Sequence, residues 1–360
     1  MELKIAVLGS GNGAHAVAFE CAGAGHNVFM YDFPQFDKSV TAITKAGGIY
    51  SEGKMEGFQK IEYAGSDIEY VLKDADLIFA VGPSYSTEPF GKACAPYVKE
   101  GQTYIVMPGS CMGALTFKKA MGLDVSDNRV TVAETSTLPY AVRIIEPGRI
   151  HVHHRLPTAY KVAALPGCRS VEVHKTLSKI FAGIELATNV LDTTLQNSNP
   201  IIHPVVTTLN AALIERTGGN FEFYHEGITP AVANLMEAVD KERMAIGKAL
   251  GFDIERSPDK GIRQEYMTYD TYYEGYSRSE AFAGISAQSQ LDHRYYNEDL
   301  GYTMIFYIDL ADRMGVDVPV MKALVTIVSV IMHRDYMAEA PRNLEKLGLG
   351  NYTPEQLVSL

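Results

Sequence analysis

Side chains that could carry out acid–base chemistry stand in two short stretches of the second half of the chain. In residues 197–204, Asn199 is expected to cap a helix and Pro200 to take its first position, which places His203 near the first turn. Pro204 lacks the N–H that would bond a carbonyl one turn earlier, so we expect a locally irregular backbone there. Imidazole can accept and donate a proton near neutral pH, but residue types alone favour a structural histidine.

The second stretch, residues 293–299, combines a cation with carboxylates. Arg294 offers a planar guanidinium fork to a carboxylate, and Asp299 could orient an imidazole and stabilise its charged form. Taken by themselves, the same residues favour a solvated, charged helix start.

A third stretch, near the amino terminus, has the spacing of a dinucleotide-binding turn. An apolar run at 5–8 leads into a glycine-rich turn at 9–14, a helix-like segment at 17–22 and a second apolar run ending at Asp32. The glycines would permit a sharp turn and close approach of a pyrophosphate, and the helix start would hold the phosphates. The predicted cofactor-binding residues are Gly9, Gly11, Asn12, Gly13, Ala14 and Asp32. A carboxylate at Asp32 would bind the adenosine ribose and repel a 2′-phosphate, so NAD is predicted rather than NADP.

The elements that must position these groups follow an α/β pattern. Apolar runs at 77–81, 104–107 and 130–133 alternate with helix-like segments. This alternation predicts a doubly wound parallel sheet of the Rossmann type, with ligands at the carboxyl ends of its strands. The turns at 81–83 and 107–110 are therefore expected to line the cofactor cleft.

Two polar groups in this part have open interpretations. The hydroxyls within residues 134–137, Thr135 among them, could contact substrate or nicotinamide, or could cap an ordinary turn. His151 and His153 alternate as on one face of a strand and could begin a metal site. No third ligand stands at a telling distance from them, so no metal is predicted.

From about residue 170 the alternation gives way to helix-like periodicity, at 205–214, 231–250 and 302–314. Residues 320–332 are apolar almost all round, which suits a helix buried in a second, mainly α-helical domain or at a subunit contact. A homodimer is therefore one expectation.

The change of pattern alone sets the expected domain limits. A dinucleotide-binding Rossmann domain is predicted for residues 1–180, and a helical substrate domain for residues 181–360.

Charge and composition narrow the class of partner. A formal net charge of −11 over 360 residues argues against nucleic acid or an anionic membrane as the main partner, and small-molecule substrates are expected. The four cysteines form no C-x-x-C pair and suit a reducing compartment. The first strand follows Met1 too closely for a signal peptide, and no apolar run reaches membrane-spanning length. We therefore expect a cytoplasmic protein.

In their order along the chain, five motifs resemble those of opine dehydrogenases of the octopine/nopaline type. They are the glycine turn at 9–14, Glu134-Thr135-Ser136, Asn199 through His203-Pro204, Glu226-Gly227-Ile228-Thr229-Pro230, and Arg294-Tyr295 through Glu298-Asp299. The glycine motif is common to many families, whereas the His-Pro and Arg-Tyr-x-x-Glu-Asp motifs are much more specific. The resemblance covers nearly the whole chain.

The resemblance implies an NAD-dependent oxidoreductase that acts on CH–NH groups. In this family an L-amino acid and a 2-oxo acid such as pyruvate form an imine, which NADH reduces. The resemblance also implies that His203 is the general acid/base, that Asp299 is its partner and that Asn199 lies near the reacting centre. Arg294 and Thr135 are the implied substrate-binding residues. A helical second domain also belongs to the family.

Two other classes stay open. One is a dehydrogenase of the related glycerol-3-phosphate, ketopantoate or hydroxyacid kinds, several of which use a lysine at the catalytic helix, where this chain has His203 and no lysine nearby in sequence. The other is a non-catalytic NAD-binding module.

Overall fold

The computed structural model describes residues 2–360 and divides into two compact units, which are described here one at a time. The first extends to Thr193 and includes Leu360, and the second is Thr194–Ser359. The division falls inside helix α7 (Val190–Leu195). The limits 1–180 for a dinucleotide-binding Rossmann domain and 181–360 for a helical substrate domain stay a prediction.

Eight strands form the main sheet of the first unit, in the order β12-β11-β8-β7-β6-β1-β2-β5. They are β1 (Lys4–Leu8), β2 (Asn27–Tyr31), β5 (Tyr63–Gly65), β6 (Leu77–Ala80), β7 (Thr103–Val106), β8 (Thr131–Thr135), β11 (Tyr160–Leu165) and β12 (Ile184–Leu186). All neighbouring pairs are parallel except β8 and β11. Nearly every side chain of β1 and β6 is buried, as in a parallel sheet covered on both faces. The predicted Rossmann-type sheet is confirmed.

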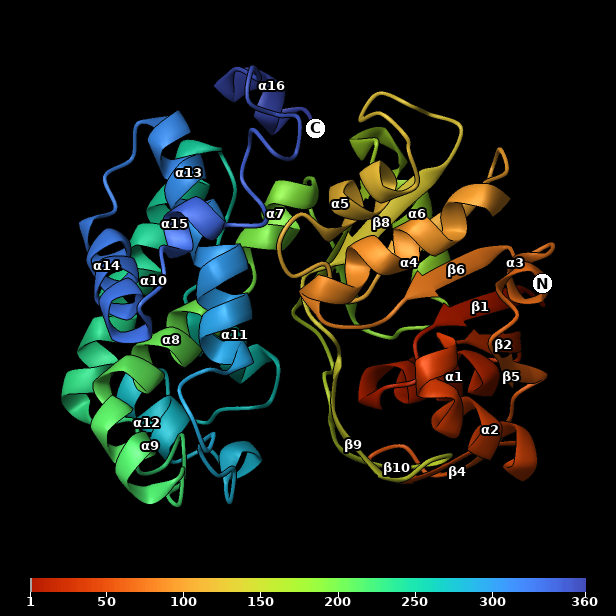
Figure 1. Ribbon diagram of the computed structural model, residues 1–360, viewed down its shortest axis with the longest axis horizontal. Coiled ribbons are helices and arrows are strands. Elements are labelled where there is room, and N and C mark those ends of the chain that lie inside the picture. Colours follow the sequence, from red (N-terminus) through yellow and green to blue (C-terminus); the bar gives the residue numbers. More distant parts are fainter. Residues whose placement is uncertain (1) are drawn as a thin grey trace. The chain divides into compact units, whose positions relative to one another are not determined.

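Helices cover this sheet. The α-helices are α1 (Asn12–Gly23), α2 (Asp37–Ala46), α3 (Ile68–Leu72), α4 (Thr87–Cys94), α5 (Gly113–Ala120) and α6 (Ser170–Leu177), and the short 3₁₀ turns are η1 (Pro34–Phe36), η2 (Ser84–Ser86), η3 (Ala95–Tyr97) and η4 (Gly167–Arg169). Helices α4 and α5 pack side by side, and α5 lies against β7 and β8 (Figure 1). The strand order reverses at β1, which lies between β2 and β6, so the carboxyl end of β1 is where this fold binds ligands.

A second, four-stranded sheet packs against α1, with the order β4-β3-β10-β9 (Figure 1). Its strands are β3 (Gly48–Gly53), β4 (Gly57–Lys60), β9 (Tyr140–Glu146) and β10 (Arg149–Arg155). Glu20 of α1 ties the two layers together, because its carboxylate accepts hydrogen bonds from Arg155 and from the Tyr140 hydroxyl. In β10, Ile150 and Val152 are buried while the rings of His151 and His153 lie 4.3 Å apart on the other face.

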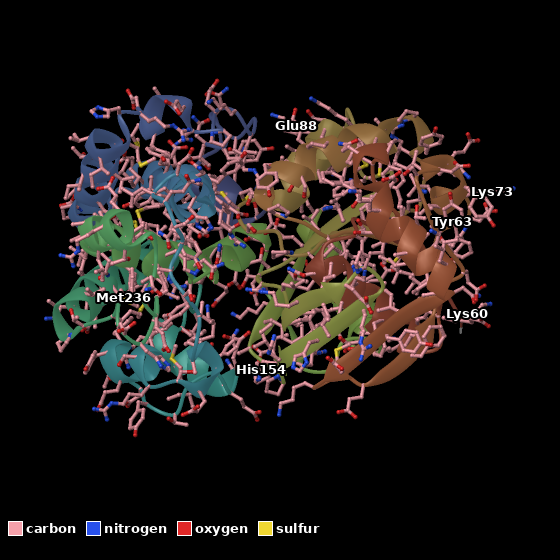
Figure 2. The ribbon with its side chains drawn as sticks, turned by 60° about the horizontal axis from the view of Figure 1, so that its bottom comes forward. Lys60, Tyr63, Lys73, Glu88, His154 and Met236 are labelled. Atoms are coloured by element: carbon pink, nitrogen blue, oxygen red, sulfur yellow. The ribbon has the colours of Figure 1, made fainter. Side chains whose placement is uncertain are left out.

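The second unit is helical, as predicted. Its elements are α8 (Asn199–Leu209), α9 (Ala211–Thr217), α10 (Pro230–Ala249), α11 (Ser257–Arg263), α12 (Tyr272–Ser277), η5 (Glu280–Phe282), η6 (Tyr295–Met304), α13 (Ile305–Met314), α14 (Pro319–Met332), α15 (Tyr336–Glu339) and α16 (Pro354–Val358). Helix α10 contacts α8, α12, α13 and α14, and its Met236 is fully buried among the helices (Figure 2).

A buried ion pair joins α10 to the elements around it. The carboxylate of Asp240 accepts from Arg243 Nε at 2.7 Å, from the backbone N–H of Ser257 at 2.8 Å and from the Tyr272 hydroxyl at 2.6 Å. Removing one partner of such a pair leaves an uncompensated charge in the core. The Asp240 cluster therefore fixes how α11 and α12 pack on α10.

Three expectations about these helices need correction. The helix expected at 205–214 is interrupted at Asn210, where α8 ends and α9 begins. Helix α14 is not buried all round, because Ile327 is 50% and Val330 70% exposed. The cap of α8 is Ser198 rather than Asn199, and the Asn197 side chain accepts the Asn199 backbone N–H at 3.1 Å.

Within residues 2–360, no helix combines the length and the apolar character that crossing a membrane requires.

Candidate active site

The glycine turn between β1 and α1 has the shape that a pyrophosphate requires. Gly9 has a φ of +117°, and a Cβ there would lie 2.5 Å from the carbonyl oxygen of Val81. A Cβ on Gly11 would meet no atom within 4 Å, so the backbone at the start of α1 is open to a ligand. Ala14 is buried where a small residue lets the helix pack closely. These residues fit the phosphates of NAD, held by the free N–H groups of the first turn.

Asp32 lies at the carboxyl end of β2, as predicted. Its Oδ2 accepts from Ser10 Oγ at 2.6 Å, and its Oδ1 from the backbone N–H of Phe33 at 2.8 Å. Burial raises the pKa of the Asp32 carboxyl, and these hydrogen bonds oppose that shift. Each carboxylate oxygen can accept a second hydrogen bond, so Asp32 fits the hydroxyls of an adenosine ribose.

Two neighbours hold the turn in place. Asn12 Oδ1 accepts the backbone N–H of Ile144 in β9 at 2.8 Å, so its side chain joins the turn to the smaller sheet. His15 Nδ1 lies 3.0 Å from the Gly11 carbonyl, and its Nε2 accepts from the Gly148 N–H at 3.4 Å. Burial lowers the pKa of His15, which keeps the ring neutral and allows one nitrogen to donate and the other to accept. Sequence reasoning missed His15; its only signal was a polar residue four positions after Gly11.

The position of Asp32 leads to a prediction about cofactor choice. A 2′-phosphate placed against this carboxylate would add a repulsion between like charges, so NADPH should bind much more weakly than NADH. Fluorescence titration of the protein with each nucleotide measures the two affinities. Equal affinities would contradict the proposed role of Asp32. An Asp32→Ala variant should show a smaller difference between its affinities for NADH and NADPH.

The Glu134-Thr135-Ser136 motif lies at the carboxyl end of β8. Glu134 Oε2 accepts the backbone N–H of Ala114 at the start of α5 at 2.7 Å, and its Oε1 accepts from Thr193 Oγ1 at 2.6 Å. Thr135 is buried and its hydroxyl donates to the Thr137 carbonyl at 3.0 Å, which is the turn-capping arrangement. A substrate contact for Thr135 stays a prediction.

In the second unit, His203 and Asp299 come together from positions 96 residues apart. His203 is buried in α8, and its Nδ1 lies 2.7 Å from Asp299 Oδ2. The carboxylate accepts from Nδ1–H, which leaves Nε2 as the proton acceptor and stabilises the imidazolium once it forms. The Tyr224 hydroxyl lies 3.1 Å from Nε2.

Aromatic rings fix the orientation of this imidazole. The ring of Tyr295 stacks on His203 with centroids 4.0 Å apart and planes 19° apart, and Phe223 approaches edge-on at 6.0 Å. Tyr295 and Asp299 both belong to η6, a π-helical segment. Such segments are rare and are often found at functional sites, and residue periodicity did not reveal this one.

Arg294 and Asn199, the remaining predicted residues of this unit, lie at the starts of η6 and α8. Arg294 precedes η6 and is half exposed, with its Nε 3.3 Å from Glu298 Oε2. Asn199 opens α8 and is half-buried. Direct roles for both residues stay predictions.

Folding brings a lysine to the start of α8 that sequence distance concealed. Lys260 of α11 donates from Nζ to Ser198 Oγ at 2.5 Å and to the Gln196 carbonyl. Both acceptors immediately precede α8, so Lys260 stabilises the backbone that leads to His203. No lysine is near His203 in the sequence, but in the folded chain Lys260 contacts the residues just before the helix that carries His203.

The Glu226-Gly227-Ile228-Thr229-Pro230 motif has a structural explanation. Thr229 caps α10 and Pro230 takes its first position. A Cβ on Gly227 would lie 2.3 Å from the Phe223 carbonyl, which explains the glycine. The motif thus sets the path of the segment that carries Tyr224.

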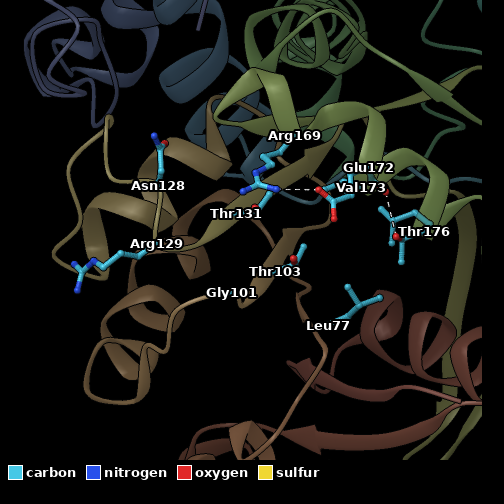
Figure 3. Close-up of a pocket in the computed structure, with 11 residues that line it drawn as sticks. Leu77, Gly101, Thr103, Asn128, Arg129, Thr131, Arg169, Glu172, Val173 and Thr176 are labelled. Carbon is cyan, nitrogen blue, oxygen red and sulfur yellow. Dashed lines mark hydrogen bonds and ion pairs between the residues drawn. The ribbon is translucent and has the colours of Figure 1, made fainter. Parts of the chain in front are cut away.

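A small pocket in the first unit lies away from these groups. Its lining includes Leu77, Thr103 and Thr131, which begin β6, β7 and β8 (Figure 3). The pocket is therefore at the amino ends of the strands, whereas the glycine turn is at their carboxyl ends. It is not the cofactor site.

His151 and His153 do share a strand face, with Glu52 Oε1 3.6 Å from His151 Nδ1. No cluster of three or more His, Cys, Asp or Glu side chains suited to a metal ion occurs among residues 2–360.

The chain combines a Rossmann-type sheet, with a glycine turn after its first strand and an acid after its second, and a helical unit with a buried His–Asp pair. This combination defines a nicotinamide-dependent dehydrogenase.

Comparison with known proteins gives the family. Residues 186–332 match the family described as NAD/NADP octopine/nopaline dehydrogenase, alpha-helical domain. An opine dehydrogenase from Arthrobacter sp. (strain 1C) is 34% identical over 350 residues, which cover 97% of this chain and 96% of that protein. Octopine dehydrogenase solved with NADH and L-arginine has the same fold, with a TM-score of 0.80 at 18% identity over 99% of this chain and 98% of that one. Its structure with NADH and pyruvate gives a TM-score of 0.77 at 20% identity over the same shares. The chain belongs to the opine dehydrogenase family and is an NAD-dependent oxidoreductase acting on CH–NH groups.

Proposed function

We propose that the chain joins the amine of an L-amino acid to the carbonyl carbon of a 2-oxo acid, with His203 as the general acid/base. The observation that carries this proposal is the 2.7 Å contact between His203 Nδ1 and Asp299 Oδ2 in a buried site. A buried carboxylate that accepts from Nδ1–H fixes the tautomer and leaves Nε2 as the proton acceptor.

The His–Asp pair accounts for the proton transfers of the condensation. An amino acid reaches the site as an ammonium ion, and loss of one proton to His203 Nε2 makes the nitrogen a nucleophile. Attack on the 2-oxo carbon then forms a carbinolamine. The imidazolium, stabilised by Asp299, returns its proton to the carbinolamine hydroxyl, which leaves as water and yields the protonated imine. NADH, when bound, supplies the hydride that reduces this imine to a secondary amine.

Charge favours a carboxylate-bearing partner for the amine. Arg294 places a guanidinium at the start of η6, one helical turn before Asp299. A guanidinium binds a carboxylate through two parallel hydrogen bonds, which would set the direction of the 2-oxo acid. Octopine dehydrogenase has been solved with L-arginine and with pyruvate. We therefore propose pyruvate or a similar 2-oxo acid as one substrate, and Asn199 as a contact near the reacting carbon.

Initial rates of NADH oxidation test the reaction class. Oxidation should require an L-amino acid and pyruvate together, and mass spectrometry should find the secondary-amine dicarboxylate. Acetaldehyde in place of pyruvate should react poorly, because it lacks the carboxylate. Oxidation with the 2-oxo acid alone would indicate a hydroxyacid dehydrogenase instead, and no oxidation across a broad panel of amines would indicate a binding module.

We also propose a cytoplasmic location and a homodimer. Within residues 2–360, Cys21, Cys94, Cys111 and Cys168 form no disulfide, which suits a reducing compartment. The exposed Ile327 and Val330 of α14 support a subunit contact on that helix.

A further inference from the structure

The proton-accepting nitrogen of His203 has a hydrogen-bond partner, the hydroxyl of Tyr224. Tyr224 Oη lies 3.1 Å from His203 Nε2, while Nδ1 is held by Asp299. Within the part of the chain that the structure describes, the Tyr224 hydroxyl is the group that hydrogen-bonds to Nε2. A proton moving between substrate and Nε2 therefore meets this hydroxyl.

We propose that Tyr224 is a catalytic residue that relays protons between the substrate and His203 Nε2. This inference rests on the proposed acid/base function of His203 and names the path that its proton takes. As the ammonium loses a proton to Tyr224 Oη, the phenolic proton moves to Nε2. Dehydration of the carbinolamine runs the relay backwards, so the phenol is unchanged after each cycle.

Packing holds the phenol in place for such a relay. The ring of Tyr224 stacks on Phe282 with centroids 4.3 Å apart and planes 15° apart, and meets Phe223 edge-on at 5.1 Å. The face of the imidazole is covered by Tyr295 at 4.0 Å. Each ring that takes part in the hydrogen bond is therefore packed against a stacked neighbour, Phe282 for Tyr224 and Tyr295 for His203.

The chemistry of the hydroxyl also suits a relay. A phenol can donate one hydrogen bond and accept others at the same time. His203 is the one hydrogen-bond partner of this hydroxyl within residues 2–360, so Oη keeps the capacity to bond a substrate nitrogen or oxygen. Burial, and then the nearby Tyr295, raise the pKa of Tyr224 well above its usual value. The phenol therefore stays protonated through neutral and mildly alkaline pH.

Other titratable groups surround the pair and would remain in a Tyr224 variant. They are Asp299 and Tyr295 of η6, His293 and Arg294 just before it, Tyr266, and Tyr276 of α12. Helices α9, α10 and α14 also contact α8, but within residues 2–360 none of them places a hydrogen-bonding or ion-pairing side chain on the imidazole. A change in pH dependence on removal of the Tyr224 hydroxyl would therefore report on that hydroxyl.

The test is Tyr224→Phe, with Tyr276→Phe as its matched control. Tyr276 lies in the same aromatic cluster, but its hydroxyl bonds Ser257 Oγ at 2.6 Å. Tyr224→Phe should lower kcat by about tenfold or more, while the affinity for NADH is unchanged. The acidic limb of kcat/KM should move to higher pH, because neutral imidazole loses a hydrogen bond that favoured it. Tyr276→Phe should leave that limb in place.

Proton inventories in mixtures of H₂O and D₂O separate a relay from a structural hydrogen bond. A plot of the wild-type rate against the fraction of D₂O should be curved, because two protons move in the relay. The same plot for Tyr224→Phe should be linear. If Tyr224→Phe folds poorly, incorporation of 3-fluorotyrosine at position 224 keeps the ring and makes the phenol a stronger hydrogen-bond donor. The acidic limb of kcat/KM should then move to lower pH, because the stronger hydrogen bond favours neutral imidazole. If Tyr224→Phe had the same kcat, pH profile and proton inventory as the wild type, the relay would be overturned. If His203→Ala were inactive in that case, the acid/base function of His203 would stand without the relay. If His203→Ala were active, the proposed acid/base function of His203 would also be overturned.

Discussion

His203→Ala should lower kcat by about 10²- to 10⁴-fold, the usual contribution of general acid–base catalysis. The physical reason is that neither loss of a proton from the ammonium nor protonation of the carbinolamine hydroxyl would have a positioned partner. The affinity for NADH should be unchanged, because Gly9, Gly11 and Asp32 belong to the other compact unit. Steady-state rates and fluorescence titration with NADH measure the two quantities separately.

A matched control for this variant is His225→Ala. His225 lies in the same unit, where its Nε2 donates to the Ser279 carbonyl at 2.8 Å and its Nδ1 pairs with Glu222. Turnover in His225→Ala should stay close to that of the wild type. If His203→Ala also kept its turnover, His203 would not be the acid/base group.

Asp299→Asn should reduce kcat by about 10²-fold or more, with little change in fold. Asparagine has nearly the same shape but lacks the negative charge that stabilises the imidazolium, and its amide can hold the wrong tautomer of His203. The loss should appear in kcat rather than in the affinity for NADH. Stopped-flow measurement of a single turnover would show whether the chemical steps are the ones slowed.

Asp292→Asn provides the comparison for this second variant. Asp292 precedes η6 and accepts from Asn297 Nδ2 at 2.7 Å, without a contact to His203. Its replacement should leave kcat unchanged. An Asp299→Asn enzyme with wild-type turnover would mean that the 2.7 Å contact only holds α8 against η6.

Local sequence predicted the parts of the site that depend on short spacing. Gly9, Gly11 and Ala14 stand at intervals that suit one turn, and Asp32 ends the next strand, so their arrangement follows from a single strand–turn–helix–strand unit. The helical character of the second half was also readable, since a 3.6-residue period repeats along each long helix. Family motifs, rather than residue types alone, identified His203 and Asp299 as a pair.

Other features were hidden because they depend on neighbours distant in sequence. Tyr224 comes within 3.1 Å of His203 only once α8 and the segment before α10 have packed together. Lys260 reaches the start of α8 from 62 residues beyond Ser198. The exposure of Val330 could not be read from an apolar stretch, because hydropathy does not say which face of a helix finds a partner.

By itself, the sequence determined a strand–turn–helix–strand unit with a glycine turn, an acid at the end of its second strand and a helical second half, because each arises from interactions over a few residues. Only the tertiary structure decided that His203 lies between Asp299 and Tyr224 with Tyr295 against its face. Hydrogen bonds and ring stacking require separations of a few ångströms, and for residues up to 96 positions apart those separations are set by packing.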